Sequence, residues 1–123
     1  MRLNADANGV GERVEIAEFE WGRKPRNLQI PYDILLLSDC ICHDENSVFR
    51  PILKSLRDLS GPETELLISY KHRSVTEDVF WEAAEEWFDI TLIEHEEAPT
   101  ESRDGDFLPM MLYRLKQRQR PTK

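Results

Sequence analysis

Three groups of residues in this chain have side chains that could do chemistry, and each follows an apolar or alternating stretch. Ser38 and Asp39 come directly after an apolar run, Trp21 ends an alternating stretch, and a second apolar run ends at Tyr70 and is followed by Lys71. A carboxylate at such a position can orient a cationic group and stabilise positive charge that develops beside it. Ligands of open α/β sheets bind beyond the carboxyl ends of the strands, where these residues are expected.

Hydrophobic periodicity predicts the elements that position these residues in the first half of the chain. Residues 13–19 alternate apolar and polar side chains, which predicts a strand ended by Trp21 and Gly22. Residues 32–37 form a nearly continuous apolar run, typical of a strand covered on both faces in a parallel sheet. Apolar residues at helical spacing then predict a helix over residues 47–59.

The second half continues the alternation of strands and helices. Residues 65–70 are a second buried-strand candidate, and Ser74 with Glu77 has the spacing of a capping box at the start of a helix that reaches residue 88. Residues 90–93 and 110–115 predict two short strands on either side of a charged loop. This order predicts an α/β fold with a mostly parallel sheet that ends in an antiparallel hairpin.

Three segments, taken in order, carry a resemblance to a known family: VEIAEFEWG, then YDILLLSDCIC with the helix through FRPILKSLRDLSGPETELLISYKHR, then FWEAAEEWFDI. They resemble the class I, seven-β-strand methyltransferases that modify protein lysines, of the type that acts on valosin-containing protein and chaperones. That group is marked by Trp-Gly after the third strand and Asp-x-x-Tyr after the fourth. The resemblance implies the C-terminal portion of a Rossmann-like methyltransferase fold.

The resemblance also implies a cofactor, a partner and site residues. The cofactor would be S-adenosyl-L-methionine and the partner a protein that presents a lysine. Trp21 and Ser38 would line the adenosine end of the cofactor pocket, and Asp39 would lie near the methyl group and the incoming lysine, as the catalytic residue and a cofactor contact. The residues that would contact the substrate are Cys42, Tyr70, Lys71 and Arg73.

The chain departs from the family pattern at two places. Cys42 stands where the motif has Tyr, so the role of that Tyr in shaping the lysine channel does not carry over. The family's opening strand, Gly-rich loop and helix are not found, because Gly9-Val10-Gly11 precedes a strand instead of following one. We therefore expect an N-terminally truncated domain, with its C-terminal half over residues 1–116 and a disordered basic tail over residues 117–123.

Truncation has a physical consequence for the sheet. In the family's sheet the first strand lies between the third and the fourth, so without it the strand at residues 32–37 has an open edge. An apolar strand with an unpaired edge favours aggregation or pairing with another chain. We expect self-association through this edge.

The charge, the apolar runs and the cysteines of the chain limit the classes of partner and the cellular compartments that are expected. The net charge of −8 opposes binding to nucleic acid phosphates, and no apolar run is long enough to span a membrane. Cys40, Cys42 and His43 lack the second ligand pair of a zinc site. The two cysteines are also too far apart along a strand for disulfide geometry, so we expect reduced thiols in the cytoplasm or nucleus.

Other functions and plainer interpretations remain beside this one. The same fold without its cofactor loop could be a non-catalytic remnant that acts as a binding or regulatory protein. A phosphoacceptor receiver domain does not fit, because its acidic pair and its later Ser/Thr and Lys are not found in the required order. An Asp that closes a strand is otherwise a turn or cap residue, and an isolated Trp is otherwise core packing.

Overall fold

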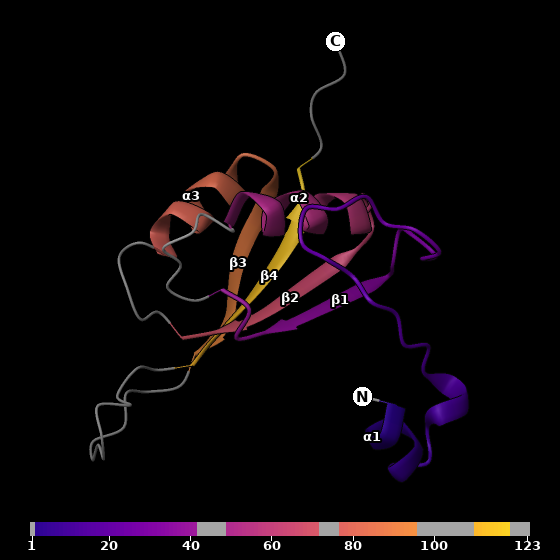
Figure 1. Cartoon of the computed structure of the whole chain (residues 1–123). Helices are drawn as coiled ribbons and strands as arrows, with labels where there is room; N and C mark the ends of the chain where they lie inside the picture. The colour runs from indigo at the N-terminus through magenta and orange to yellow at the C-terminus, as the bar shows by residue number, and fades with distance from the viewer. Residues whose placement is uncertain (1, 42–48, 72–76, 96–109, 119–123) are drawn as a thin grey trace, which may run out of the picture.

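The computed structural model describes residues 2–41, 49–71, 77–95 and 110–118. In chain order the elements are helix α1 (Arg2–Ala7), a 3-10 helix η1 (Gly11–Arg13), β1 (Ile34–Ser38), α2 (Phe49–Leu59), β2 (Glu65–Tyr70), α3 (Asp78–Glu85), β3 (Phe88–His95) and β4 (Met111–Gln117) (Figure 1). The sequence predicted β2 with both of its bounds and α2 with its last residue. The expected first turn of α2, at residues 47 and 48, lies outside the described residues.

The four strands form one open sheet in the order β1-β2-β4-β3. β1 and β2 are parallel, whereas β4 runs antiparallel to both β2 and β3. The α/β class and the antiparallel pair at the end of the chain are therefore confirmed. Among the described strands β1, β2 and β3 run in the same direction and only β4 is reversed, so the sheet is mostly parallel in strand direction, as expected, although β4 lies between β2 and β3 and makes both of its pairings antiparallel.

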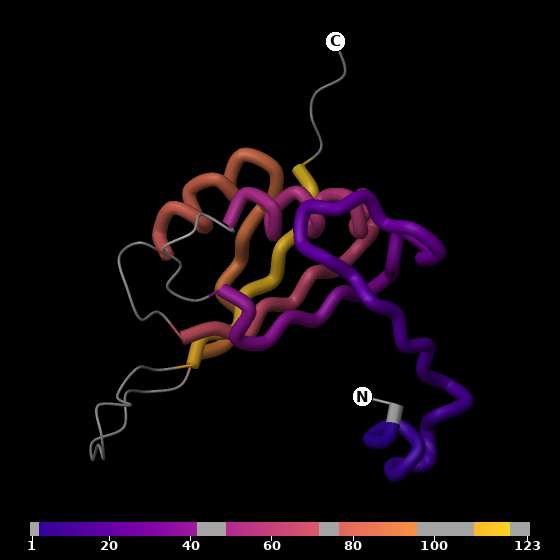
Figure 2. Tube along the Cα trace, in the orientation of Figure 1, coloured from indigo at the N-terminus to yellow at the C-terminus, as the bar shows by residue number. Residues whose placement is uncertain are grey.

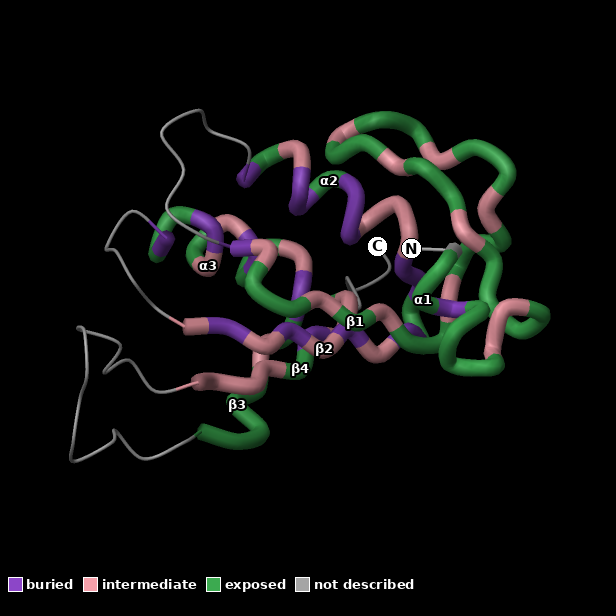
Figure 3. Tube along the Cα trace, turned by 60° about the horizontal axis from the view of Figure 1, so that its bottom comes forward, coloured by how far each residue is buried: buried purple, intermediate pink, exposed green. Residues whose placement is uncertain are grey.

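Helices α2 and α3 cover one face of the sheet, and the core lies between them and the strands (Figure 1). Along β2 every second residue is buried, namely Leu66, Ile68 and Tyr70. Figure 3 shows this burial concentrated along β2 and on the side of α2 that faces it. A period of two in β2 and an apolar stripe on α2 thus place their buried residues against each other.

The opposite face of the sheet is exposed at β1. Ile34 and Leu36 alternate with the better-buried Leu35 and Leu37, and their side chains are 56% and 75% exposed. Within the described part of the chain β1 also forms one edge of the sheet, with β2 as its neighbour. The sequence-based expectation of an open edge at this strand is therefore met among the described strands.

The strand expected at residues 13–19 is not formed. Residues 11–13 belong to η1, and residues 14–20 have no regular structure. A strand forms only where a neighbour satisfies its backbone N–H and C=O groups. Here the segment instead leads from α1 to a loop that reaches the side of α2 (Figure 2).

Helix α3 and its neighbouring strands have bounds that differ from those expected. The helix ends at Glu85, because Phe88 already pairs with Gln117 as the first residue of β3. β4 likewise extends past the expected residue 115 to Gln117. The proposed capping residue Ser74 lies outside the described residues.

Candidate functional site

Asp39 follows β1 directly, at the carboxyl end of the strand. Its backbone N–H donates a 3.1 Å hydrogen bond to the carbonyl oxygen of Ser69 at the end of β2, and its φ of 55° lies in the left-handed region. That conformation costs a non-glycine residue about 1–2 kcal/mol, although Asp tolerates it better than most. Strain of this kind is found most often at functional sites. The side chains of Ser38 and Asp39 are both exposed.

Cys40 continues the same turn. Its Sγ donates a 3.6 Å hydrogen bond to the carbonyl oxygen of Ser38, and its thiol is free. Cys42, the expected substrate contact, lies outside the described residues.

Tyr70 ends β2 and is buried, with only 2% of its surface exposed. Its hydroxyl donates a 2.5 Å hydrogen bond to Oε1 of Glu77, which is fully buried just before α3. Burial raises the pKa of the Tyr70 hydroxyl above its ordinary value, and the neighbouring Glu77 carboxylate raises it further. The ring of Tyr70 also packs on Trp81, with the centroids 5.3 Å apart. Tyr70 thus joins the end of β2 to Glu77, the residue that precedes α3.

Lys71 follows Tyr70 and is half-buried, while Arg73 lies outside the described residues. Because β1 and β2 are parallel and Ser38 pairs with Ser69, Lys71 lies at the same sheet edge as Asp39. Ser38, Asp39 and Lys71 therefore lie at the same end of the sheet, as the sequence predicted, whereas the side chain of Tyr70 turns into the core.

Trp21 is placed by a tight turn rather than by a strand. The N–H of Arg23 donates a 3.1 Å hydrogen bond to the carbonyl oxygen of Glu20, and the side chains of these residues form an ion pair at 2.9 Å. Gly22 is the third residue of this turn and has a φ of 85°. A residue with a side chain adopts that backbone angle only with strain. The Trp-Gly order follows from this geometry, because the residue after Trp21 has to be glycine.

The turn is seated on α2 through Gly22. Its backbone N–H donates a 2.7 Å hydrogen bond to Oγ of Ser55, which is fully buried. A Cβ at Gly22 would lie 2.9 Å from Cβ of Pro51, closer than real side chains approach. Sequence reasoning missed Pro51 and Ser55 as supports of Trp21. The available signal was a serine inside the apolar stripe of a helix, four residues after a proline.

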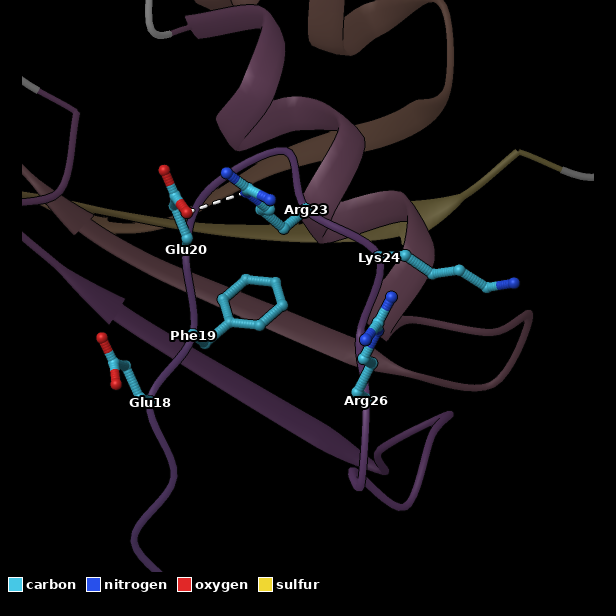
Figure 4. Close-up of a pocket in the computed structure, with 6 residues that line it drawn as sticks. All are labelled: Glu18, Phe19, Glu20, Arg23, Lys24 and Arg26. Atoms are coloured by element: carbon cyan, nitrogen blue, oxygen red, sulfur yellow. Dashed lines mark ion pairs between the residues drawn. The ribbon is translucent and has the colours of Figure 1, made fainter.

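A hollow of about 500 Å³ lies between the two arms of this turn. Figure 4 shows Glu18, Phe19 and Glu20 on one arm and Arg23, Lys24 and Arg26 on the other, with the ring of Phe19 pointing between them. Trp21 itself is 38% exposed, and its ring meets that of Phe19 edge to face with the centroids 6.2 Å apart. Aromatic surface and charges of both signs are therefore available beside Trp21.

The far end of the sheet carries a different cluster. The guanidinium of Arg57 stacks 3.3 Å from the ring centroid of Trp87, and Gln117 donates a 3.0 Å hydrogen bond to the carbonyl oxygen of Ser60. A hollow of about 370 Å³ lies there, lined by Arg57, Asp58, Trp87, Gln117 and Arg118. These contacts join the end of α2 to the ends of β3 and β4, so the cluster has a structural role.

None of the helices in the described ranges is both long enough and apolar enough to cross a membrane.

The site residues fall into two groups. Ser38, Asp39, Tyr70 and Lys71 lie at the carboxyl ends of β1 and β2, and Trp21 lies on the side of α2. Residues 1–87 match the model of a protein family described as lysine methyltransferase. Because the match covers more than half of the 123 residues, the protein belongs to the lysine methyltransferase family.

Proposed function

We propose that this protein is an S-adenosylmethionine-dependent protein-lysine N-methyltransferase of the type that modifies valosin-containing protein and chaperones. The observation that carries the proposal is Asp39, an exposed carboxylate in a left-handed backbone conformation at the carboxyl end of β1. It is supported by the family match over residues 1–87. Fold and family alone do not fix an activity, so the site residues carry the argument.

Asp39 would act on the amine that receives the methyl group. A lysine side chain has a pKa of about 10.4, so removing its proton at pH 7 costs about 4.6 kcal/mol. A carboxylate can guide the ammonium group into place and stabilise the positive charge that returns to nitrogen when the new bond forms. When bound, S-adenosylmethionine supplies an electrophilic methyl group. Alignment of the two groups would account for much of the rate.

Trp21 and Ser38 would hold the cofactor, together with Asp39. The partly exposed indole of Trp21 beside the ring of Phe19 fits an adenine base, since aromatic faces stack on bases. The Gly22 seat on α2 fixes the position of that indole. Ser38 is a small, exposed residue next to Asp39, which leaves room for a ligand to approach the strand end.

The substrate would be a protein that presents a lysine, and the net charge of −8 favours such a basic segment. Lys71, Arg73 and Cys42 would contact it from the segments that follow β1 and β2. Tyr70 would contribute by anchoring one of these segments, because its hydroxyl is bound to Glu77 inside the core. In this proposal residues 1–116 form the C-terminal half of a Rossmann-like class I domain.

A labelled-methyl transfer assay tests the proposal. The chain is incubated with S-adenosyl-L-methionine carrying a tritiated methyl group and with valosin-containing protein or a chaperone as the acceptor. We expect label on an acceptor lysine, and an Asp39→Ala variant that is slower by about 100-fold or more. Asp33→Ala changes an exposed carboxylate at the other end of β1 and is the matched control. Equal rates for the two variants would remove Asp39 from the chemistry.

A non-catalytic binding protein of the same fold is the second candidate. Within the part of the chain that the structure describes, Trp21, Ser38 and Asp39 are not among the residues that line the hollows of about 500, 370 and 240 Å³. Calorimetry of the chain with S-adenosylmethionine separates the two functions. Binding of S-adenosylmethionine at micromolar concentration would contradict the non-catalytic function. A titration without any heat of binding would contradict the proposed methyltransferase function.

We also propose that copies of the chain associate through the edge of β1. The strand has no charged residue or proline among Ile34–Ser38, and its exposed side chains include Leu36. Natural edge strands are usually protected by such residues or by a bulge.

The free thiol of Cys40 supports a location in the cytoplasm or nucleus, where thiols stay reduced.

A further inference from the structure

A small hollow lies beside the carboxyl end of β2, next to the strand end that carries Asp39. Its volume is about 240 Å³, and the described residues that line it are Ser69, Glu94, Met110 and Leu112. Ser69 is the residue whose carbonyl oxygen accepts the hydrogen bond from Asp39. A residue that lines the hollow is therefore hydrogen-bonded to Asp39 through the backbone.

Three of the lining residues stand in one row across the sheet. Ser69 pairs with Leu112, and Leu112 pairs with Glu94. The row continues from Ser69 to Ser38 on β1. Residues directly opposite each other in a sheet point to the same face, so this row runs over the face that α2 and α3 leave uncovered.

A β-bulge puts Glu94 into this row. The register of β3 and β4 shifts between Leu92 and Glu94, so that Leu92 pairs with Tyr113 and Glu94 pairs with Leu112. If the same sequence kept a regular register past Leu92, Ile93 would pair with Leu112, and Glu94 would turn to the face covered by the helices. The bulge thus replaces an isoleucine by a carboxylate at this point, as bulges near active sites re-aim side chains.

The lining is complementary to a basic side chain. Leu112 and Met110 offer apolar surface for an aliphatic stem, and the hydroxyl of Ser69 holds the sulfur of Met110 at 3.1 Å. Glu94 offers an exposed carboxylate for the charged end of that side chain. The ion pairs within the described ranges engage other residues, so this carboxylate is available.

We propose that this hollow binds a basic side chain of the substrate that flanks the lysine to be methylated. The proposal rests on the proposed function, because it takes Asp39 as the place of the target lysine. From β1 to β3 the row crosses three strand spacings, which is roughly 14 Å. An extended peptide covers that distance in about four residues. The enzyme should therefore prefer a lysine or arginine about four residues from its target.

The experiment observes the hollow directly and needs neither cofactor nor methyl transfer. The full chain is labelled with ¹³C-methyl methionine and titrated with Nα-acetyl-lysine methylamide, while the Met110 signal is followed by NMR after assignment with a Met110→Leu variant. We expect the Met110 signal to shift with millimolar affinity, and not to shift with Nα-acetyl-norleucine methylamide, which has no charge. Equal shifts with both compounds, or none with either, would overturn the proposal.

Two variants and one control complete the test. Glu94→Gln should raise the dissociation constant about fivefold, the factor that corresponds to about 1 kcal/mol. Deletion of Ile93 removes the bulge but leaves Glu94 directly after Leu92 and opposite Leu112, so the carboxylate stays on this face and binding should be retained. Glu82→Gln removes an exposed carboxylate on α3 and should bind as the original chain does. Unchanged binding by Glu94→Gln would contradict the site, whereas binding without any methyl transfer would contradict only the proposed function.

Discussion

The hydroxyl of Tyr70 donates its 2.5 Å hydrogen bond to a Glu77 carboxylate that is fully buried, so the end of β2 and the start of α3 are joined inside the core. Tyr70→Phe removes the donor and leaves a buried carboxylate oxygen without it. We expect a loss of about 1–3 kcal/mol in the free energy of unfolding, measured by urea denaturation. Tyr113→Phe is the control, because that hydroxyl makes no hydrogen bond within the described residues. An equal loss in both variants would mean that the bond to Glu77 adds nothing.

The raised pKa of Tyr70 also predicts a pH dependence. A phenol with a raised pKa holds its proton more tightly in the folded protein than in the unfolded one. Its contribution to stability is therefore complete below the unfolded-state value of about 10 and is lost as the pH rises above it. The stability gap between the original chain and Tyr70→Phe should shrink between about pH 9 and about pH 12. A gap that stays constant over this range would show that Tyr70 keeps an ordinary pKa.

Gly22→Ala tests the seat of Trp21. The new Cβ meets Pro51 at 2.9 Å in a backbone with φ of 85°, so strain of about 1–2 kcal/mol is joined by a steric clash. Gly9→Ala has a similar φ of 71° and open space around its Cβ. Thermal unfolding should therefore show a larger loss for Gly22→Ala than for Gly9→Ala. An equal loss of thermal stability in the two variants would contradict the close contact between Gly22 and Pro51 of α2.

Asp39→Gly separates function from stability at one position. Glycine adopts the φ of 55° without strain, so the free energy of unfolding should stay within about 1 kcal/mol of that of the original chain. Methyl transfer should nevertheless be lost, because the carboxylate is gone. A large loss of stability would show that the Asp39 side chain mainly supports the turn.

Leu36→Lys tests self-association through β1. This side chain is 75% exposed, so a charge there should leave the fold intact while it disfavours edge pairing. Analytical ultracentrifugation should show fewer dimers or larger species than for the original chain. Val79→Lys, at a 60% exposed position on α3, is the control and should not change the distribution. A monomeric original chain would contradict the association itself.

Local patterns predicted the elements whose structure depends on local burial. The alternation in β2 and the apolar stripe of α2 are both repeated in the burial of Leu66, Ile68, Ile52 and Leu56. The edge position of Asp39 followed from the same reasoning, because parallel strands bring their carboxyl ends together. The choice of Asp39 itself came from the family resemblance.

The remaining features depend on contacts between distant segments, which periodicity does not report. Residues 13–19 alternate as a strand does, yet the segment attaches to α2 through Gly22 and Ser55 instead of joining the sheet. The bulge at Ile93 becomes visible only from the pairing of β3 with β4. Even the correct elements therefore left the supports of Trp21 and the position of Glu94 undetermined.

The place of β4 in the sheet has a consequence for synthesis. It is the last strand along the chain, yet it lies between β2 and β3 and supplies a backbone partner to both. Chains emerge from the ribosome with the N-terminal end first, so β3 has no partner in this sheet until Gln117 has been made. A nascent chain stalled before Met111 would leave unpaired the two strand edges that β4 later covers, one on β2 and one on β3, and would be a ready target for chaperones.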